Sequence, residues 1–179
     1  MKNHKGINMI NIEALALVQD ENTSAEVLDT LSADEDEFLR ARVAAHINTS
    51  GQTLKKLSKD ESGLVREFVA EHLNTPVETL VELSEDRYMA SWVAGNPNTP
   101  MEILEKLSDD LDQFVRISIS VNPKITGEIL DKLSKDLDEN VRAAVAKNPF
   151  VSDEILDRLS KDENEDVRNV VAEHPRNVD

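Results

Sequence analysis

Pairs of leucines three residues apart recur along this chain at nearly constant intervals. The first leucine of each pair stands at positions 28, 54, 80, 104, 130 and 156, and the second at 31, 57, 83, 107, 133 and 159. A serine follows each second leucine at once, and an aspartate stands two residues after that serine. Intervals of 24 to 26 residues are typical of solenoids and other repeat proteins. The pattern therefore predicts a stack of about six copies of one structural unit.

The first part of each repeat predicts a short amphipathic helix. Its apolar stripe is narrow, as in Ile129, Leu130 and Leu133, which suits a helix of about two to three turns. We expect a threonine N-cap with Glu or Gln three residues later in the first four repeats, at Thr23, Thr49, Thr75 and Thr99. In the last two repeats we expect the cap one residue later, at Thr126 and Ser152. Helices this short are marginal alone, so they must share a core with their neighbours.

The second part of each repeat predicts another helix with a buried valine face. Val141 and Val145 are an i, i+4 pair of this kind, and Asn148-Pro149 ends the helix because a residue before proline is pushed out of the helical region. The slot of that asparagine is filled in the six repeats by His46, His72, Asn96, Asn122, Asn148 and His174. A residue that alternates with asparagine at a helix end is expected to form hydrogen bonds rather than to bind a metal.

These elements predict an all-α fold, a right-handed α-α superhelix (solenoid) of about six two-helix repeats of 24–26 residues. We expect residues 1–21 to form an N-terminal tail and capping helix, residues 22–175 the repeat array, and residues 176–179 a tail. In the capping helix, Ile12, Leu15 and Val18 are expected to cover the first repeat.

An arginine stands six residues after the aspartate in five of the six repeats. Because the pair recurs, we interpret it as a structural ladder that braces loop and helix rather than as a catalytic acid–base pair. The ladder residues are Asp34, Arg40, Asp60, Arg66, Asp110, Arg116, Asp136, Arg142, Asp162 and Arg168. The third repeat is two residues shorter and has Ala90 in the arginine slot, so we expect Arg87 to partner Asp86 there.

The strings NPNTPMEILEKLSDD (96–110) and VRAAVAKNP (141–149) resemble the leucine-rich repeat variant family, HEAT-like α-solenoids of bacteria. The aspartate–arginine spacing is similar to the ladder of HEAT repeats, in which each pair joins the two helices of its repeat. This resemblance covers roughly residues 22–175. It implies a surface for macromolecules and allows the second helix to be α throughout or partly 3₁₀. The family's cysteine-held iron–sulfur cluster does not carry over, because this chain has no cysteine.

Composition narrows the class of partner. Asp and Glu number 36 against 20 Lys and Arg, for a net charge of −16, so nucleic acid and anionic membranes are expected to be repelled. The absence of cysteine excludes disulfides and thiolate metal sites and suits a cytoplasmic location. No apolar run approaches the ~18 residues of a membrane span, and no glycine-rich phosphate loop is present. We therefore expect no cofactor and no metal.

The second helices are expected to line the concave side of the solenoid. Rotation by about 100° per residue places an apolar row opposite their buried valines. The candidate partner-binding residues are Phe38, Leu64, Tyr88, Trp92, Phe114, Ile117 and Val121. An aromatic in the first turn could instead fold over the loop into the core, and the sequence leaves this alternative open.

The sequence predicts a non-enzymatic scaffold or adaptor that binds a protein or peptide, with a preference for basic ones, on its concave face. An alternative is an acidic inhibitor that mimics nucleic acid, which would need carboxylates aligned on one face. An enzyme is a third hypothesis, because some similar solenoids act on DNA bases through a basic face, and the acidic composition opposes it. The oligomeric state does not follow from the sequence.

Overall fold

The computed structural model describes residues 9–175, and in this range the chain forms thirteen α-helices and no β-strand. It divides into two compact halves, residues 1–83 and 84–179, and the division falls between the two helices of the third repeat. The expected tails at residues 1–8 and 176–179 lie outside the described residues. The all-α prediction is confirmed.

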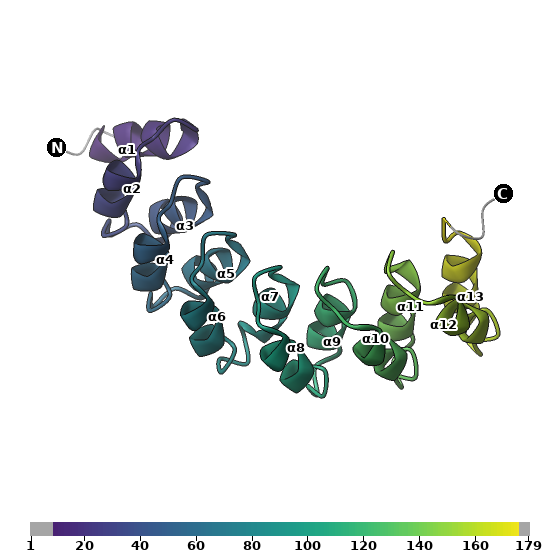
Figure 1. Cartoon of the computed structure of the whole chain (residues 1–179). Helices are drawn as coiled ribbons and strands as arrows, with labels where there is room; N and C mark the ends of the chain where they lie inside the picture. Colours follow the sequence, from purple (N-terminus) through teal and green to yellow (C-terminus); the bar gives the residue numbers. More distant parts are fainter. Residues whose placement is uncertain (1–8, 176–179) are drawn as a thin grey trace. The chain divides into compact units, whose positions relative to one another are not determined.

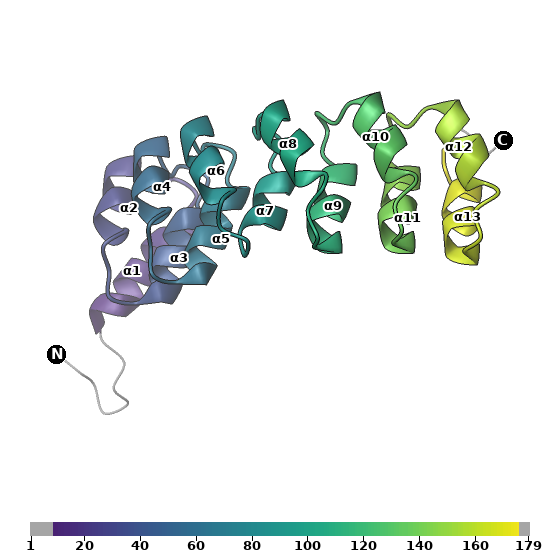
Figure 2. The same ribbon diagram turned by 90° about the horizontal axis from the view of Figure 1, so that it is seen from below.

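The N-terminal half consists of two layers of helices (Figures 1 and 2). One layer holds the first helices of the repeats, α2 (Ala25–Leu31), α4 (Gly51–Leu57) and α6 (Val77–Leu83). The other holds α1 (Met9–Gln19), α3 (Glu37–Ala45) and α5 (Gly63–Glu71). In this second layer α3 packs between α1 and α5, so α1 occupies the place of a preceding second helix.

The C-terminal half repeats this arrangement (Figures 1 and 2). The first helices are α8 (Met101–Leu107), α10 (Gly127–Leu133) and α12 (Asp153–Leu159). The second helices are α7 (Ala90–Gly95), α9 (Gln113–Ser120), α11 (Glu139–Lys147) and α13 (Glu165–Ala172), and each packs on the next. All of them are α-helices, which answers the question of α or 3₁₀ character for the second helix.

The recurring leucines and valines form the core in both halves. The first leucine of every repeat is no more than 5% exposed, from Leu28 at 0% to Leu156 at 5%. Val65 and Val69 of α5 and Val141 and Val145 of α11 are wholly buried. Since each of these side chains removes apolar surface from water, short helices that are unstable alone hold one another in place.

The capping helix buries a different stripe from the one expected. Ala14 and Val18 are 4% and 7% exposed, whereas Ile12 is 54% exposed. The prediction for Val18 is correct and that for Ile12 is wrong. Helix α1 contacts a single neighbouring second helix, α3, and a one-sided contact covers only a narrow stripe.

The threonines of the first repeats do not cap the helices that follow them. Ser24 and Ser50 do so instead, by accepting from the backbone N–H of the third residue beyond. Thr49 and Thr99 are 0% exposed, and their hydroxyls donate to the carbonyls of Val43 and Val93, six residues earlier. Each threonine therefore satisfies a carbonyl at the end of the preceding helix. The predicted caps at Thr126 and Ser152 are correct.

Histidine and asparagine perform the same task at the ends of the second helices. His72 Nε2 lies 3.0 Å from the carbonyl of His46, one repeat earlier, and its Nδ1 accepts from the N–H of Asn74 at 2.9 Å. Asn122 donates to the carbonyl of Asn96 and accepts from the N–H of Lys124. These side chains tie each repeat to the one before it, as expected for hydrogen-bonding residues.

Candidate functional site

The arginine ladder joins successive repeats through paired hydrogen bonds. Arg40 Nε and Nη2 donate to the two carboxylate oxygens of Asp60 at 2.6 and 2.9 Å. Arg116 binds Asp136 in the same way at 2.7 and 2.9 Å, and Arg142 binds Asp162 at 2.8 and 2.9 Å. The partner lies twenty residues further along the chain, in the next repeat. The expectation that the aspartate of the same repeat supplies the carboxylate is therefore wrong.

The same-repeat aspartate contributes its backbone instead of its side chain. Arg116 Nη1 donates to the carbonyls of Asp110 and Leu111, and Arg142, Arg66 and Arg168 bind the equivalent loop carbonyls. The hydrogen bonds from Arg40 and Arg142 lower the pKa values of Asp60 and Asp162. Because these side chains are only 8% to 11% exposed, the pairs hold the stack together and are not open to a substrate.

The gap in the ladder falls at a different aspartate from the one expected. The twenty-residue register places Ala90, in the arginine slot of the third repeat, opposite Asp110. The Asp110 side chain accepts from the N–H of Asp112 at 2.8 Å, as the aspartates of complete repeats do at their own loops. The missing arginine therefore affects Asp110 rather than Asp86.

The apolar row predicted from the sequence is largely exposed. Phe38, in the N-terminal half, is 62% exposed and Leu64 is half-buried. In the C-terminal half Tyr88, Phe114 and Val121 are 70%, 63% and 53% exposed, Trp92 is 37% exposed, and Ile117 is half-buried. The alternative in which the aromatics fold into the core is thus wrong for Phe38, Tyr88 and Phe114.

Phe114 lines an open hollow between the loops of the fourth and fifth repeats. The hollow has a volume of about 480 Å³. Two leucines that the sequence analysis did not single out, Leu111 and Leu137, also line it and are 99% and 98% exposed. Each of them directly follows the repeated aspartate, in a slot that holds glutamate in the first, second and sixth repeats. The replacement of glutamate by leucine in this slot is the sequence signal that identifies them. We refer to this feature as the leucine hollow.

An equivalent hollow lies between the first and second repeats, with a volume of about 560 Å³. Phe38 takes the place of Phe114 and Arg40 the place of Arg116. Glu35 and Glu61 stand in the two leucine slots. We refer to this feature as the glutamate hollow. The two hollows therefore share a phenylalanine and a ladder arginine, and they differ most in the two loop slots, which hold leucine in one and glutamate in the other.

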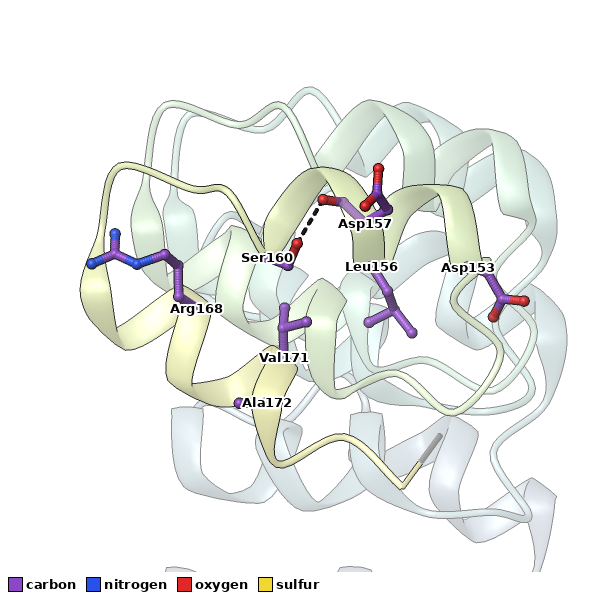
Figure 3. Close-up of a pocket in the computed structure, with 7 residues that line it drawn as sticks. All are labelled: Asp153, Leu156, Asp157, Ser160, Arg168, Val171 and Ala172. Atoms are coloured by element: carbon purple, nitrogen blue, oxygen red, sulfur yellow. Dashed lines mark hydrogen bonds between the residues drawn. The ribbon is translucent and has the colours of Figure 1, made fainter. Parts of the chain in front are cut away.

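Another hollow, of about 750 Å³, lies at the last repeat (Figure 3). Leu156 of α12 and Val171 of α13 point into it, and the guanidinium of Arg168 is directed away from both. Ser160 donates to the backbone carbonyl of Asp157 at its edge. This hollow is the outer side of the last helix pair.

Within residues 9–175, no helix is long and apolar enough to cross a bilayer. No group of three or more His, Asp or Glu side chains in that part of the chain is placed to hold a metal ion.

A comparison with family models finds no match, and a search of curated proteins finds none. Among solved structures, the chain is similar to a protein described as a leucine-rich repeat variant with a novel repetitive protein structural motif. The two are 25% identical, with a TM-score of 0.41, and the match covers 92% of this chain and 82% of the other. That description names the family that the sequence motifs resemble.

Proposed function

We propose that this chain is a binding scaffold whose leucine hollow holds a protein segment with an apolar anchor among basic residues. Stacked helical repeats serve in general as binding surfaces, since their frame is set by neighbouring repeats and their outer side chains are free to vary. The fold alone does not specify a partner. The partner is therefore inferred from the residues that line the leucine hollow.

The exposure of Leu111 and Leu137 carries the proposal. Burying one leucine side chain contributes about 1.5–3 kcal/mol, and here two leucines beside Phe114 are left in water around one depression. Solvent-exposed leucines scattered singly need no explanation, but apolar side chains gathered beside one another and rimmed by acids are typical of interaction sites. An apolar anchor inserted between them would gain that burial.

The charge at the rim favours basic residues next to the anchor. Asp112, Asp138 and Glu139 line the leucine hollow, and the whole chain carries a net charge of −16. Opposite charge steers association and contributes to specificity. We therefore expect binding that weakens, without vanishing, as salt is raised.

The apolar surface extends along α9 to Ile117 and Val121, as the sequence indicates. Val121 is 53% exposed and Ile117 is half-buried. We include both in the proposed contact surface. An Ile117→Asp, Val121→Asp variant that stays helical is expected to bind the probe peptides below more weakly than the parent chain, and equal binding would remove these residues from the surface.

The test uses short fluorescein-labelled peptides in which a Leu, Phe or Trp anchor stands among lysine and arginine residues, with binding measured by fluorescence anisotropy. The variant Leu111→Glu, Leu137→Glu places glutamate in both leucine slots, as in the glutamate hollow. We expect it to lose at least about tenfold in affinity, because the anchor loses its apolar contacts.

A matched variant separates apolar contact from charge. Leu111→Gln, Leu137→Gln removes the apolar side chains without adding charge and should lose nearly as much affinity. Helical circular dichroism must be unchanged in both variants, since neither leucine contributes to the core. If peptides bind the parent chain and both variants equally, the leucine hollow is not the binding site and the proposed function is wrong.

A further inference from the structure

The break in the arginine ladder coincides with a cavity in the C-terminal half. In three other places the ladder aspartate receives a guanidinium from the preceding repeat, at Asp60, Asp136 and Asp162. In the ladder slot opposite Asp110 the preceding repeat has the methyl group of Ala90 in place of an arginine. A cavity of about 580 Å³ lies there, and both Ala90 and Asp110 line it.

The shortened loop of the third repeat does not need an arginine. In complete repeats the arginine satisfies carbonyls of its own loop, as Arg116 does at Asp110 and Leu111. In the third repeat the carbonyl of Asp86 instead accepts from the N–H groups of Met89 and Ala90 at 2.8 and 3.1 Å. The loop is thus closed by its own backbone, and the Asp110 carboxylate is the part of the arginine site that remains.

The two cations that line the cavity are engaged by groups other than Asp110. Lys106 Nζ lies 2.7 Å from Glu85, and the guanidinium of Arg87 lies over the ring of Tyr88, 5.3 Å from its centroid. Within the described part of the chain, the Asp110 side chain is therefore held by the N–H of Asp112 and not by a cation.

We infer that this cavity binds a guanidinium group from outside the chain, which takes the place of the missing ladder arginine on Asp110. The equivalent carboxylates show the chemistry that such a group would find, with Nε and Nη2 donating to both oxygens as Arg116 does to Asp136. The planar fork of a guanidinium fits a carboxylate through two parallel hydrogen bonds, whereas an ammonium group acts as a point charge.

The cavity adjoins the leucine hollow, since Leu111 and Asp112 line both. One protein segment can therefore place an arginine on Asp110 and an apolar side chain beside Phe114. For an arginine within a peptide the inference rests on the proposed function, while a free guanidinium compound tests the cavity alone.

The experiment compares two probe peptides that differ at one position, arginine in one and its neutral isostere citrulline in the other. We expect the parent chain to bind the arginine peptide about tenfold tighter, as hydrogen bonds between ionised groups allow. The preference should disappear in Asp110→Asn, which keeps the shape of the side chain. It should also disappear in Ala90→Arg, which supplies the ladder arginine from within.

The outcomes separate this inference from the proposed function. If both peptides bind the parent chain equally and Leu111→Glu, Leu137→Glu weakens both, the guanidinium site is wrong and the proposed function stands. If neither peptide binds but arginine methyl ester, followed by NMR, shifts the amides of Asp110 and Asp112 in the parent chain and not in Ala90→Arg, the cavity binds a free guanidinium and the proposed function fails. A preference for arginine that persists in both variants overturns the inference, and so does the absence of any binding.

Discussion

The leucine hollow and the glutamate hollow are the same structure with different surfaces. Each lies between two loops and is lined by one aromatic, Phe114 or Phe38, and one ladder arginine, Arg116 or Arg40. The largest difference in polarity lies at two exposed loop positions, Leu111 and Leu137 in one and Glu35 and Glu61 in the other. The linings also differ where Gln113 and Asp138 stand in the leucine hollow and Glu37 and Ser62 in the glutamate hollow. The buried ladder bonds therefore hold the same geometry in both hollows, and under the proposed function the loop slots determine what each hollow binds.

Because both hollows have the same ladder bond, we expect removal of either ladder arginine to lower the free energy of unfolding by the same large amount. Arg40→Ala and Arg116→Ala each leave a buried carboxylate, on Asp60 or Asp136, without its partner. Breaking such a pair costs about 3 kcal/mol or more, to be measured as the free energy of unfolding in urea. As a control, Lys161→Ala removes an exposed pair with Asp157 and should cost less than about 1 kcal/mol. Markedly unequal losses at Arg40 and Arg116 would show that the two hollows are not held by equivalent ladder bonds.

Placing leucine in both loop slots should make the glutamate hollow bind like the leucine hollow. Glu35→Leu, Glu61→Leu should create a second binding site for the probe peptides, about tenfold stronger than any residual affinity of the glutamate hollow, because leucine burial contributes about 1.5–3 kcal/mol. It is best measured in a chain that also carries Leu111→Glu, Leu137→Glu, so that the original site is silent.

A matched control for this exchange is Glu35→Gln, Glu61→Gln. It removes the same two charges without adding apolar surface, and we expect it to bind no better than the parent hollow. Equal gains from the leucine and glutamine exchanges would mean that repulsion by the glutamates, and not the lack of leucines, distinguishes the two hollows.

A smaller loss of stability is expected on replacing the buried threonines, whose hydroxyls bind carbonyls at the end of the preceding helix. Thr49→Val leaves the carbonyl of Val43 without its hydroxyl donor and should lower the free energy of unfolding by about 1 kcal/mol. The loss is modest because Ile125 and Val151 occupy the same slot in the fifth and sixth repeats, at 7% and 0% exposure. A loss of zero would show that this hydroxyl does not support the frame.

The smallest expected effect is on the pH dependence of the free energy of unfolding. Burial lowers the pKa of His72 below its ordinary value of 6.5, so the unfolded chain takes up a proton more readily than the folded one. The free energy of unfolding should therefore fall as the pH drops below about 6.5, because a protonated Nδ1 cannot accept from the N–H of Asn74. In His72→Asn, which copies Asn122, this part of the pH dependence should vanish. If the urea midpoints of the parent chain and His72→Asn differ by the same amount at every pH, this prediction is wrong.

The buried core and the hydrogen bonds between repeats could largely be predicted from the sequence, because the residues that form them recur in every repeat. The leucine at position 28 and its five counterparts are buried as expected, and the alternation of histidine with asparagine correctly indicates a hydrogen-bonding role. The sequence predicts the aspartate–arginine pairs within one repeat, and this prediction is wrong because each guanidinium binds the aspartate of the next repeat. A spacing of six residues along the chain suggests a local pair, whereas stacking places the carboxylate of Asp60 on the guanidinium of Arg40, which binds Asp34 at its backbone carbonyl.

The candidate site was only partly predictable. A helical projection identifies Phe114 and Val121 because they belong to α9 and its end, but it ignores loops, and so it missed Leu111 and Leu137. Comparison of the repeats slot by slot would have found them, since leucine replaces the glutamate of three other repeats. The threonine caps were misassigned because a Thr-Ser or Thr-Pro sequence does not reveal which residue turns toward the preceding helix.

Chemical-shift mapping by NMR, with the probe peptide that binds tightest, locates the binding surface directly. We expect amide shifts at residues 111–116 and 137–139, around the leucine hollow, and none of comparable size at residues 35–40 and 61–62 around the glutamate hollow. Shifts of equal size at both hollows, or shifts only around the glutamate hollow, would contradict the claim that the two loop leucines make the binding surface.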